Sequence, residues 1–199
     1  MITALDQNTA LVLIDLQKGI LGQSLAHSTE TLLANAARLL DGFHREQLPV
    51  VIVNVNPVGA AWVDARADSD AVKKTAQAAA TVPGFDAIVP EILVSPTDIR
   101  ITKKTWNAFY ATALHEELLK RGVTGIVLGG VATSIGVEGT ARAASERGYN
   151  ISFAIDAMTD RSEEAHQHSI TNIFPRIGES GTTEDILAKL KNRVAPDEE

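Results

Sequence analysis

The run Ala10-Leu11-Val12-Leu13-Ile14-Asp15 decides the fold class of this chain. Five consecutive apolar residues are typical of a strand that is buried on both faces, and this one ends on a carboxylate. A second run of the same kind, Val50-Val51-Ile52-Val53-Asn54-Val55, is closed by Asn56-Pro57. Shorter apolar runs predict three further strands, at 98–102, 124–128 and 149–155.

The stretches between these runs have the apolar spacing of helices. Ser28 is a plausible N-cap for the first long helix, which reaches Phe43. Further helices are expected at 112–121, 134–147, 162–173 and 182–191, with a short alanine-rich one at 68–80. Alternating strands and helices predict a doubly wound, Rossmann-like parallel sheet with helices on both faces. No internal repeat or linker divides the sequence, so we expect one domain over residues 1–199.

Composition excludes several classes of site. The 199 residues include no cysteine, so a disulfide, a cysteine-ligated metal and a thiolate nucleophile are all impossible. The balance of 18 Lys and Arg against 25 Asp and Glu gives a net charge of −7, which argues against a nucleic-acid partner. No signal peptide or membrane-spanning run stands out, so we expect a cytoplasmic protein with no membrane partner.

Ligands of doubly wound sheets bind beyond the carboxyl ends of the strands. The residues at those ends are therefore the first candidates for function: Asp15, Asn56, Lys103, the turn 129–136 and Asp156. Asp15 is either a structural carboxylate or a buried general acid or base with a raised pKa. Strand alternation places Lys103 on the face of Ile101, where its charge needs an acidic partner, and Asp15 would serve. The alternative is that Lys103 is an ordinary surface lysine, as most lysines are.

The glycine-rich turn Gly129-Gly130-Val131-Ala132-Thr133-Ser134-Ile135-Gly136 joins a buried strand to a helix. Its spacing matches neither the dinucleotide-binding nor the P-loop pattern, but its N–H groups could form an oxyanion hole.

The histidines lack metal-binding spacing, and no metal or other cofactor is predicted; they are His27, His44, His115, His166 and His168.

These motifs together resemble the isochorismatase-like hydrolase superfamily, also called cysteine hydrolases. The resemblance runs from Ala10 to about Lys191 and rests on motifs in order along the chain. They are Leu13-Ile14-Asp15-Leu16-Gln17, Thr102-Lys103, Trp106-Asn107-Ala108-Phe109, Gly130-Val131-Ala132-Thr133-Ser134, Thr140-Ala141-Arg142-Ala143-Ala144 and Asp156-Ala157-Met158.

The resemblance implies a six-stranded parallel sheet and a catalytic Asp–Lys–Cys triad. Asp15 and Lys103 match its first two members, and Gly136 stands at the cysteine position. It also implies a cis peptide between Val131 and Ala132, with the N–H groups of Ala132 and Gly136 facing an oxyanion. The substrate-binding positions expected here are Gln17, Asn56, Trp106, Phe109 and Thr133, while Arg66 or Arg161 could pair with a carboxylate and Trp62 could line a pocket or an interface.

Glycine at position 136 rules out a thioester intermediate, and the Asp-x-His zinc motif of nicotinamidases is missing after the second strand. The isochorismatase branch of the superfamily needs neither, because it hydrolyses a vinyl ether by acid–base chemistry. The resemblance therefore implies a cysteine-independent hydrolase of isochorismate or a related small acid, with Asp15 as the acid and Lys103 as its counter-ion. A homodimer or homotetramer is also implied.

Two other interpretations stay open at this point. The chain could be an inactive member that binds a small molecule or acts as a scaffold, with Asp15 and Lys103 kept as a structural ion pair. Alternatively, Gly136 could replace a native cysteine, although a chain with no other cysteine argues against that history.

Overall fold

The computed structural model describes residues 1–60 and 70–194. Its centre is one six-stranded, all-parallel sheet with the strand order β3-β2-β1-β4-β5-β6. The doubly wound fold class and the strand number are thus confirmed. The strands are β1 (Thr9–Ile14), β2 (Val50–Val55), β3 (Ile99–Lys103), β4 (Gly125–Val131), β5 (Asn150–Thr159) and β6 (Glu179–Gly181). Strand order reverses between β1 and β4, the place where such sheets bind ligands.

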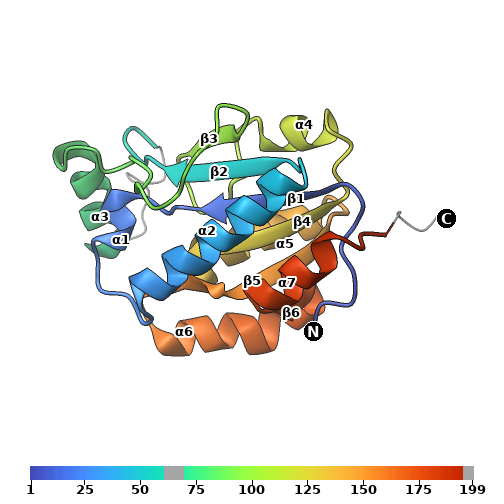
Figure 1. The fold of residues 1–199 in the computed structure, drawn as a ribbon. Helices are drawn as coiled ribbons and strands as arrows, with labels where there is room; N and C mark the ends of the chain where they lie inside the picture. The colour runs from blue at the N-terminus through green and yellow to red at the C-terminus, as the bar shows by residue number, and fades with distance from the viewer. Residues whose placement is uncertain (61–69, 195–199) are drawn as a thin grey trace.

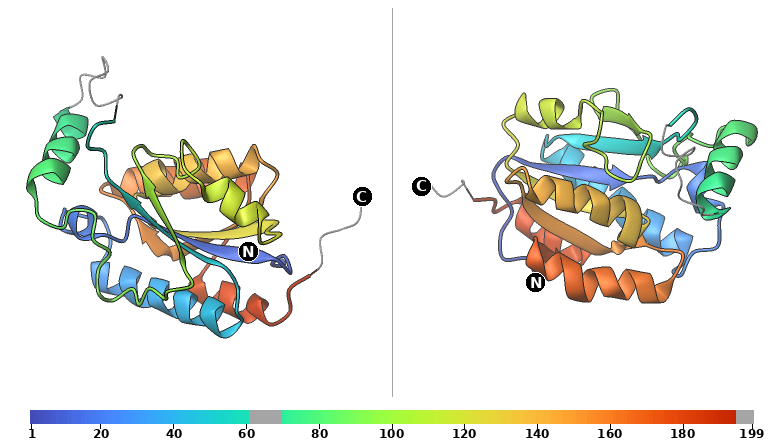
Figure 2. Two further views of the ribbon diagram at one scale, coloured as in Figure 1. Left: turned by 90° about the horizontal axis from the view of Figure 1, so that it is seen from above. Right: turned by 180° about the vertical axis from the view of Figure 1, so that it is seen from behind.

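Helices cover both faces of the sheet. They are α1 (Lys18–Leu21), α2 (Thr29–Arg45), α3 (Asp70–Thr81), α4 (Leu114–Leu119), α5 (Glu138–Ser145), α6 (Glu163–His168) and α7 (Thr183–Leu190). Figure 1 shows α2 and α7 side by side on one face, and the rear view in Figure 2 shows α5 across the other. Each face carries its own apolar layer, since successive residues of β1 such as Leu13 and Ile14 belong to different clusters.

Local sequence signals account for several helix starts. The side chain of Ser28, the expected N-cap, accepts a hydrogen bond from the Thr31 N–H at the start of α2. Thr182 and Asp185 form a reciprocal capping box at the start of α7. These polar contacts satisfy N–H groups that have no acceptor within their own helix.

The structure differs from the sequence-based expectations in three respects. The strand expected to end at 155 continues to Thr159, so Asp156 lies within β5. The helices expected at 134–147 and 162–173 each include a π-helical segment, at Thr133–Val137 and Ser169–Ile173. The short strand β6 and the single-turn helix α1 were not expected at all. Trp62, Arg66 and the first residues of the helix expected at 68–80 lie outside the described residues.

Glycine is required where β4 passes β1 most closely. Gly130 has a φ of +118°, and a Cβ atom there would lie 2.1 Å from the carbonyl oxygen of Ile14. No other residue could occupy this position without separating the two strands. The glycine therefore allows the turn after β4 to start directly beside Asp15.

In the part of the chain that the structure describes, no helix is long and apolar enough to cross a membrane.

Candidate active site

Asp15 and Lys103 form a buried ion pair at the carboxyl ends of β1 and β3. The Lys103 Nζ donates to Asp15 Oδ2 over 2.7 Å, and the two residues are only 2% and 4% exposed. The alternating burial of β3 places Lys103 on its inner face, as the sequence predicted. Asp15 has a φ of +51°, a conformation that costs a residue other than glycine about 1–3 kcal/mol and that occurs preferentially at functional sites.

The second carboxylate oxygen of Asp15 has no partner. Oδ1 is buried and accepts no hydrogen bond from any described residue. Removing an ionised carboxylate from water is costly, so burial raises the pKa of Asp15, and the attraction of Lys103 only partly opposes this rise. A proton on Oδ1 relieves the desolvation of that oxygen while Oδ2 keeps its bond to Lys103. This arrangement is suited to a general acid.

Gly136 brings the turn after β4 against this pair. A Cβ atom on Gly136 would lie 3.4 Å from Asp15 Oδ2 and 2.9 Å from Ile14 Cγ2, so glycine lets the turn pack close against the carboxylate where a side chain would force Ile14 to move. The peptide bond between Val131 and Ala132 is cis, as the resemblance implied. Among the described residues, the Ala132 N–H has no acceptor, while its carbonyl accepts from the N–H groups of Ile135 and Val137.

Three polar contacts hold the turn from outside. The side chain of Thr133 lies 2.8 Å from His166 Nδ1, and both residues are buried. Ser134 donates its N–H and its hydroxyl to Asp160 Oδ2 over 2.7 and 2.8 Å. On the other side, the Thr140 hydroxyl donates to the Gly136 carbonyl over 2.7 Å.

The sequence pattern does not reveal Asp160, because Asp156 interrupts the apolar run and predicts a strand end four residues before the true one. It is 3% exposed and directly follows the strand, so it is the strand-end carboxylate that was sought at Asp156. Asp156 lies elsewhere: its Oδ1 accepts from the N–H and hydroxyl of Thr183, at the start of α7. A strand boundary at Thr159 would have directed attention to Asp160.

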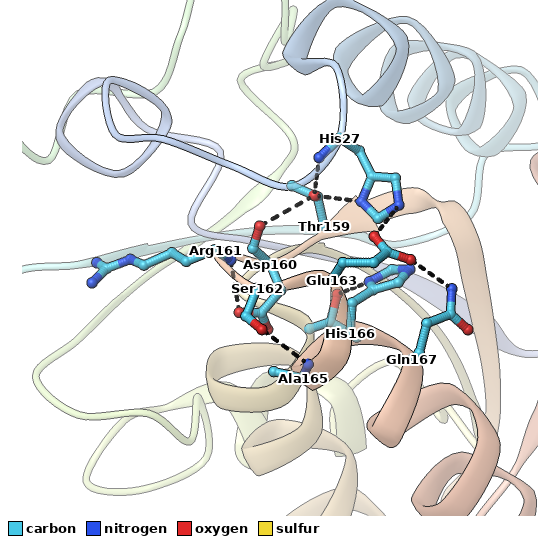
Figure 3. Close-up of polar contacts among 10 residues, drawn as sticks. His27, Thr159, Asp160, Arg161, Ser162, Glu163, Ala165, His166 and Gln167 are labelled. Atoms are coloured by element: carbon cyan, nitrogen blue, oxygen red, sulfur yellow. Dashed lines mark hydrogen bonds and ion pairs between the residues drawn. The ribbon is translucent and has the colours of Figure 1, made fainter.

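A histidine cluster lies next to these contacts. Figure 3 shows His27 above the end of β5, between Thr159 and Glu163. Its Nδ1 lies 2.9 Å from the Thr159 hydroxyl and its Nε2 lies 3.1 Å from Glu163 Oε2. The His27 ring packs against that of His166, with 4.5 Å between ring centroids. These contacts fix the junction of β5 and α6.

Two expected substrate-binding residues have internal partners instead. Gln17 is fully buried, and its side-chain amide bonds to the backbone of Val55 and Phe85. Asn56 donates to Asp86 Oδ2 over 2.9 Å and accepts from the Val58 N–H. The structure thus uses Gln17 to join the loop after β1 to β2.

The other three expected substrate-binding residues lie apart from one another. Thr133 faces His166, while Phe109 is buried and stacks on Tyr149. Trp106 is 55% exposed and lines an open groove of about 860 Å³ with Tyr110. Arg161 also lies after β5, and Figure 3 shows its side chain pointing away from the histidine cluster. Across residues 1–60 and 70–194, no three His, Asp or Glu side chains are placed to hold a metal ion.

Comparison with known proteins gives a consistent result. The model of the isochorismatase domain family matches residues 9–185. The uncharacterised isochorismatase family protein YwoC of Bacillus subtilis is 41% identical over 186 residues, covering 93% of this chain and 95% of YwoC. The corresponding protein YecD of Escherichia coli O157:H7 is 38% identical over 194 residues, covering 92% of this chain and 97% of YecD.

A solved structure extends the likeness to three dimensions. An isochorismatase family protein from Burkholderia thailandensis superposes with a TM-score of 0.84 at 35% identity, covering 96% of this chain and all of that one. Sequence and fold agree over almost the full length, and the chain belongs to the isochorismatase family.

Proposed function

We propose that this protein hydrolyses the vinyl ether of a small carboxylic acid such as isochorismate, with Asp15 as general acid and with no covalent intermediate. The observation that carries the proposal is the state of the Asp15 carboxyl. Oδ2 is held by Lys103 at 2.7 Å, while Oδ1 is buried without a partner and burial raises the pKa. A carboxyl in this setting keeps its proton to a higher pH than a free aspartic acid and can donate it to a bound substrate.

The composition of the site supports a route without a nucleophile. The chain contains no cysteine, and Gly136, whose Cβ would lie 3.4 Å from Asp15 Oδ2, carries no side chain that could act as a nucleophile. A thiol that is absent cannot form an acyl-enzyme, so amide hydrolysis by that route is excluded. Vinyl-ether hydrolysis needs only a proton donor, a water molecule and stabilisation of charge.

Each step then has a group that performs it. The proton on Asp15 adds to the methylene carbon of the enol ether and leaves an oxocarbenium ion on the ether carbon. Lys103 stabilises the carboxylate formed in this step. Water adds to the cation and returns a proton to Asp15, and the hemiketal then breaks into pyruvate and the ring alcohol. A positioned general acid contributes about 10²- to 10⁴-fold to such a rate.

The test is pyruvate release from isochorismate, measured with a coupled dehydrogenase assay. Wild-type protein is expected to release pyruvate, and Asp15→Asn is expected to lose the activity while remaining folded. Asp156→Asn serves as a control for loss of a carboxylate, since its partner is Thr183 in α7.

Two results would contradict the proposal. Full activity of Asp15→Asn would remove the assigned acid. A wild-type protein that binds isochorismate but releases no pyruvate from it or from related vinyl ethers would favour the alternative, a small-molecule-binding family member without catalytic activity.

A further inference from the structure

The carboxylate of Asp160 fixes the turn that places Gly136 against Asp15. Its Oδ2 accepts two hydrogen bonds from Ser134, one from the N–H at 2.7 Å and one from the hydroxyl at 2.8 Å. Ser134 stands two residues before Gly136 in the same π-helical segment. A movement of Ser134 would therefore shift Gly136 and change its packing against Asp15.

Asp160 also accepts hydrogen bonds from two backbone N–H groups. Its Oδ1 accepts from the Arg161 N–H over 2.7 Å, and its backbone carbonyl accepts from the Ala26 N–H over 2.8 Å. The residue is 3% exposed, so its bonds to Ser134 do not compete with bulk water. Hydrogen bonds to a buried carboxylate are among the stronger ones in proteins, and they are directional.

The contact also selects which N–H groups remain available. Asp160 takes up the Ser134 N–H, and the Ala132 carbonyl takes up those of Ile135 and Val137. The Ala132 N–H, which precedes these residues, has no acceptor within the described residues. The contact with Asp160 thus leaves the Ser134 N–H unable to bind another acceptor, while the Ala132 N–H stays available.

We infer that Asp160 is a positioning residue for the reaction: it acts through Ser134 to hold the turn 131–136, and with it Gly136, in its close position against Asp15. The inference rests on the proposed function where it concerns catalysis. It does not depend on that function where it concerns the rigidity of the turn.

The chain provides a matched control four residues before Asp160, within β5. Asp156 accepts the same two kinds of bond from Thr183, from the N–H at 2.7 Å and from the hydroxyl at 2.8 Å. Thr183 begins α7, whereas Ser134 belongs to the turn after β4. Loss of either carboxylate removes an equivalent pair of bonds, but only Asp160 reaches the turn.

The experiment compares Asp160→Ala with Asp156→Ala in three measurements: amide hydrogen exchange, thermal unfolding and the kinetics of pyruvate release. In Asp160→Ala, exchange in residues 133–137 is expected to be at least about tenfold faster. The kcat is expected to fall about 10- to 100-fold with little change in KM. A reacting group that is misplaced by up to about 1 Å lowers the rate by this much. Asp156→Ala should accelerate exchange only in the first turn of α7 and should keep its kcat.

Milder variants keep the inference testable if Asp160→Ala does not fold. Ser134→Ala and Thr183→Ala each delete one hydroxyl bond of 2.8 Å, and only the first is expected to lower kcat. Asp160→Asn can still accept both bonds from Ser134 and loses only the bond from Arg161, so it should recover most of the activity.

The outcomes separate the two proposals. Unchanged exchange in residues 133–137, or an equal loss of kcat in Ser134→Ala and Thr183→Ala, would overturn the role of Asp160. A wild-type protein that releases no pyruvate would instead refute the proposed function, and the exchange measurement would still decide whether Asp160 fixes the turn.

Discussion

Lys103 Nζ lies 2.7 Å from Asp15 Oδ2, and water reaches almost nothing of either side chain. The two residues are 88 positions apart in the sequence and meet only because β1 and β3 both end at the same edge of the sheet. Burying two charges is costly, and their mutual attraction seldom exceeds that cost by much. The pair is therefore better explained by chemistry than by stability.

The first prediction concerns removal of the lysine. Lys103→Met keeps the length of the side chain but leaves the Asp15 carboxylate without a counter-ion, and breaking a buried pair in this way costs about 3–5 kcal/mol. The free energy of unfolding should fall less at pH 5 than at pH 8, because protonated Asp15 needs no partner. Denaturant unfolding at both pH values measures this. An equal loss at both would show that the charge of Lys103 does not matter to Asp15.

The second prediction is the pH dependence of the proposed reaction. Burial raises the pKa of Asp15 above its usual 3.8, and the acid form is the one that donates the proton. The kcat for pyruvate release should therefore be highest on the acidic side and decline as pH rises through the raised pKa. A rate that instead increases with pH through this range would mean that ionised Asp15 acts as a base.

The same titration should appear in the stability of the protein. A carboxyl whose pKa is raised by folding binds a proton that the unfolded chain has already released. Its contribution to stability is complete below the unfolded value and is lost as pH rises through the folded pKa. Asp15→Asn should lack this part of the pH dependence, which unfolding curves at several pH values would show. A slope identical to that of the wild type would contradict a raised pKa.

The third prediction tests the close packing of Gly136 against Asp15. Gly136→Ala places a methyl group 2.9 Å from Ile14 Cγ2 and 3.4 Å from Asp15 Oδ2, so either Ile14 or the turn must move away from the ion pair. Overpacking of this kind costs about 1–3 kcal/mol, and kcat should fall with it. Gly139→Ala is the matched control three residues further on, because its Cβ would meet nothing nearer than 3.5 Å. Equal kinetics in the two variants would show that the reaction does not depend on the close packing of Gly136 against Asp15.

Much of this fold could be predicted because its signals are local and strong. The apolar run ending at Asp15 and the alternation ending at Lys103 identified two strand ends, and a parallel topology brings such ends to one edge. β6 escaped detection because Glu179-Ser180-Gly181 is a three-residue edge strand without an apolar pattern.

Asp160 escaped detection for a different reason. Asp156 interrupts the apolar run of β5 and imitates a strand end, yet its carboxylate is satisfied by Thr183, a partner 27 residues away that no local pattern reveals. Tertiary partners thus decide which aspartate contacts the turn after β4 and which one contacts α7. The same holds for Gln17, whose buried amide bonds to the backbone of β2 rather than facing a ligand.

The last prediction concerns the histidine beside the turn. Burial lowers the pKa of His166, and the nearby His27 lowers it further, against smaller opposing effects of Glu163 and Asp160. The folded protein therefore keeps His166 neutral at pH values where the unfolded chain binds a proton, so the free energy of unfolding should fall as pH drops through about 6.5. His166→Asn keeps a polar atom for Thr133 and removes the titration, and should be less sensitive to this drop. His168→Asn, at an exposed position of the same helix, controls for the loss of a histidine. If His166→Asn and wild type lose stability equally between pH 7 and pH 5, His166 is not the group that resists protonation, and the acid sensitivity must arise from another part of the molecule.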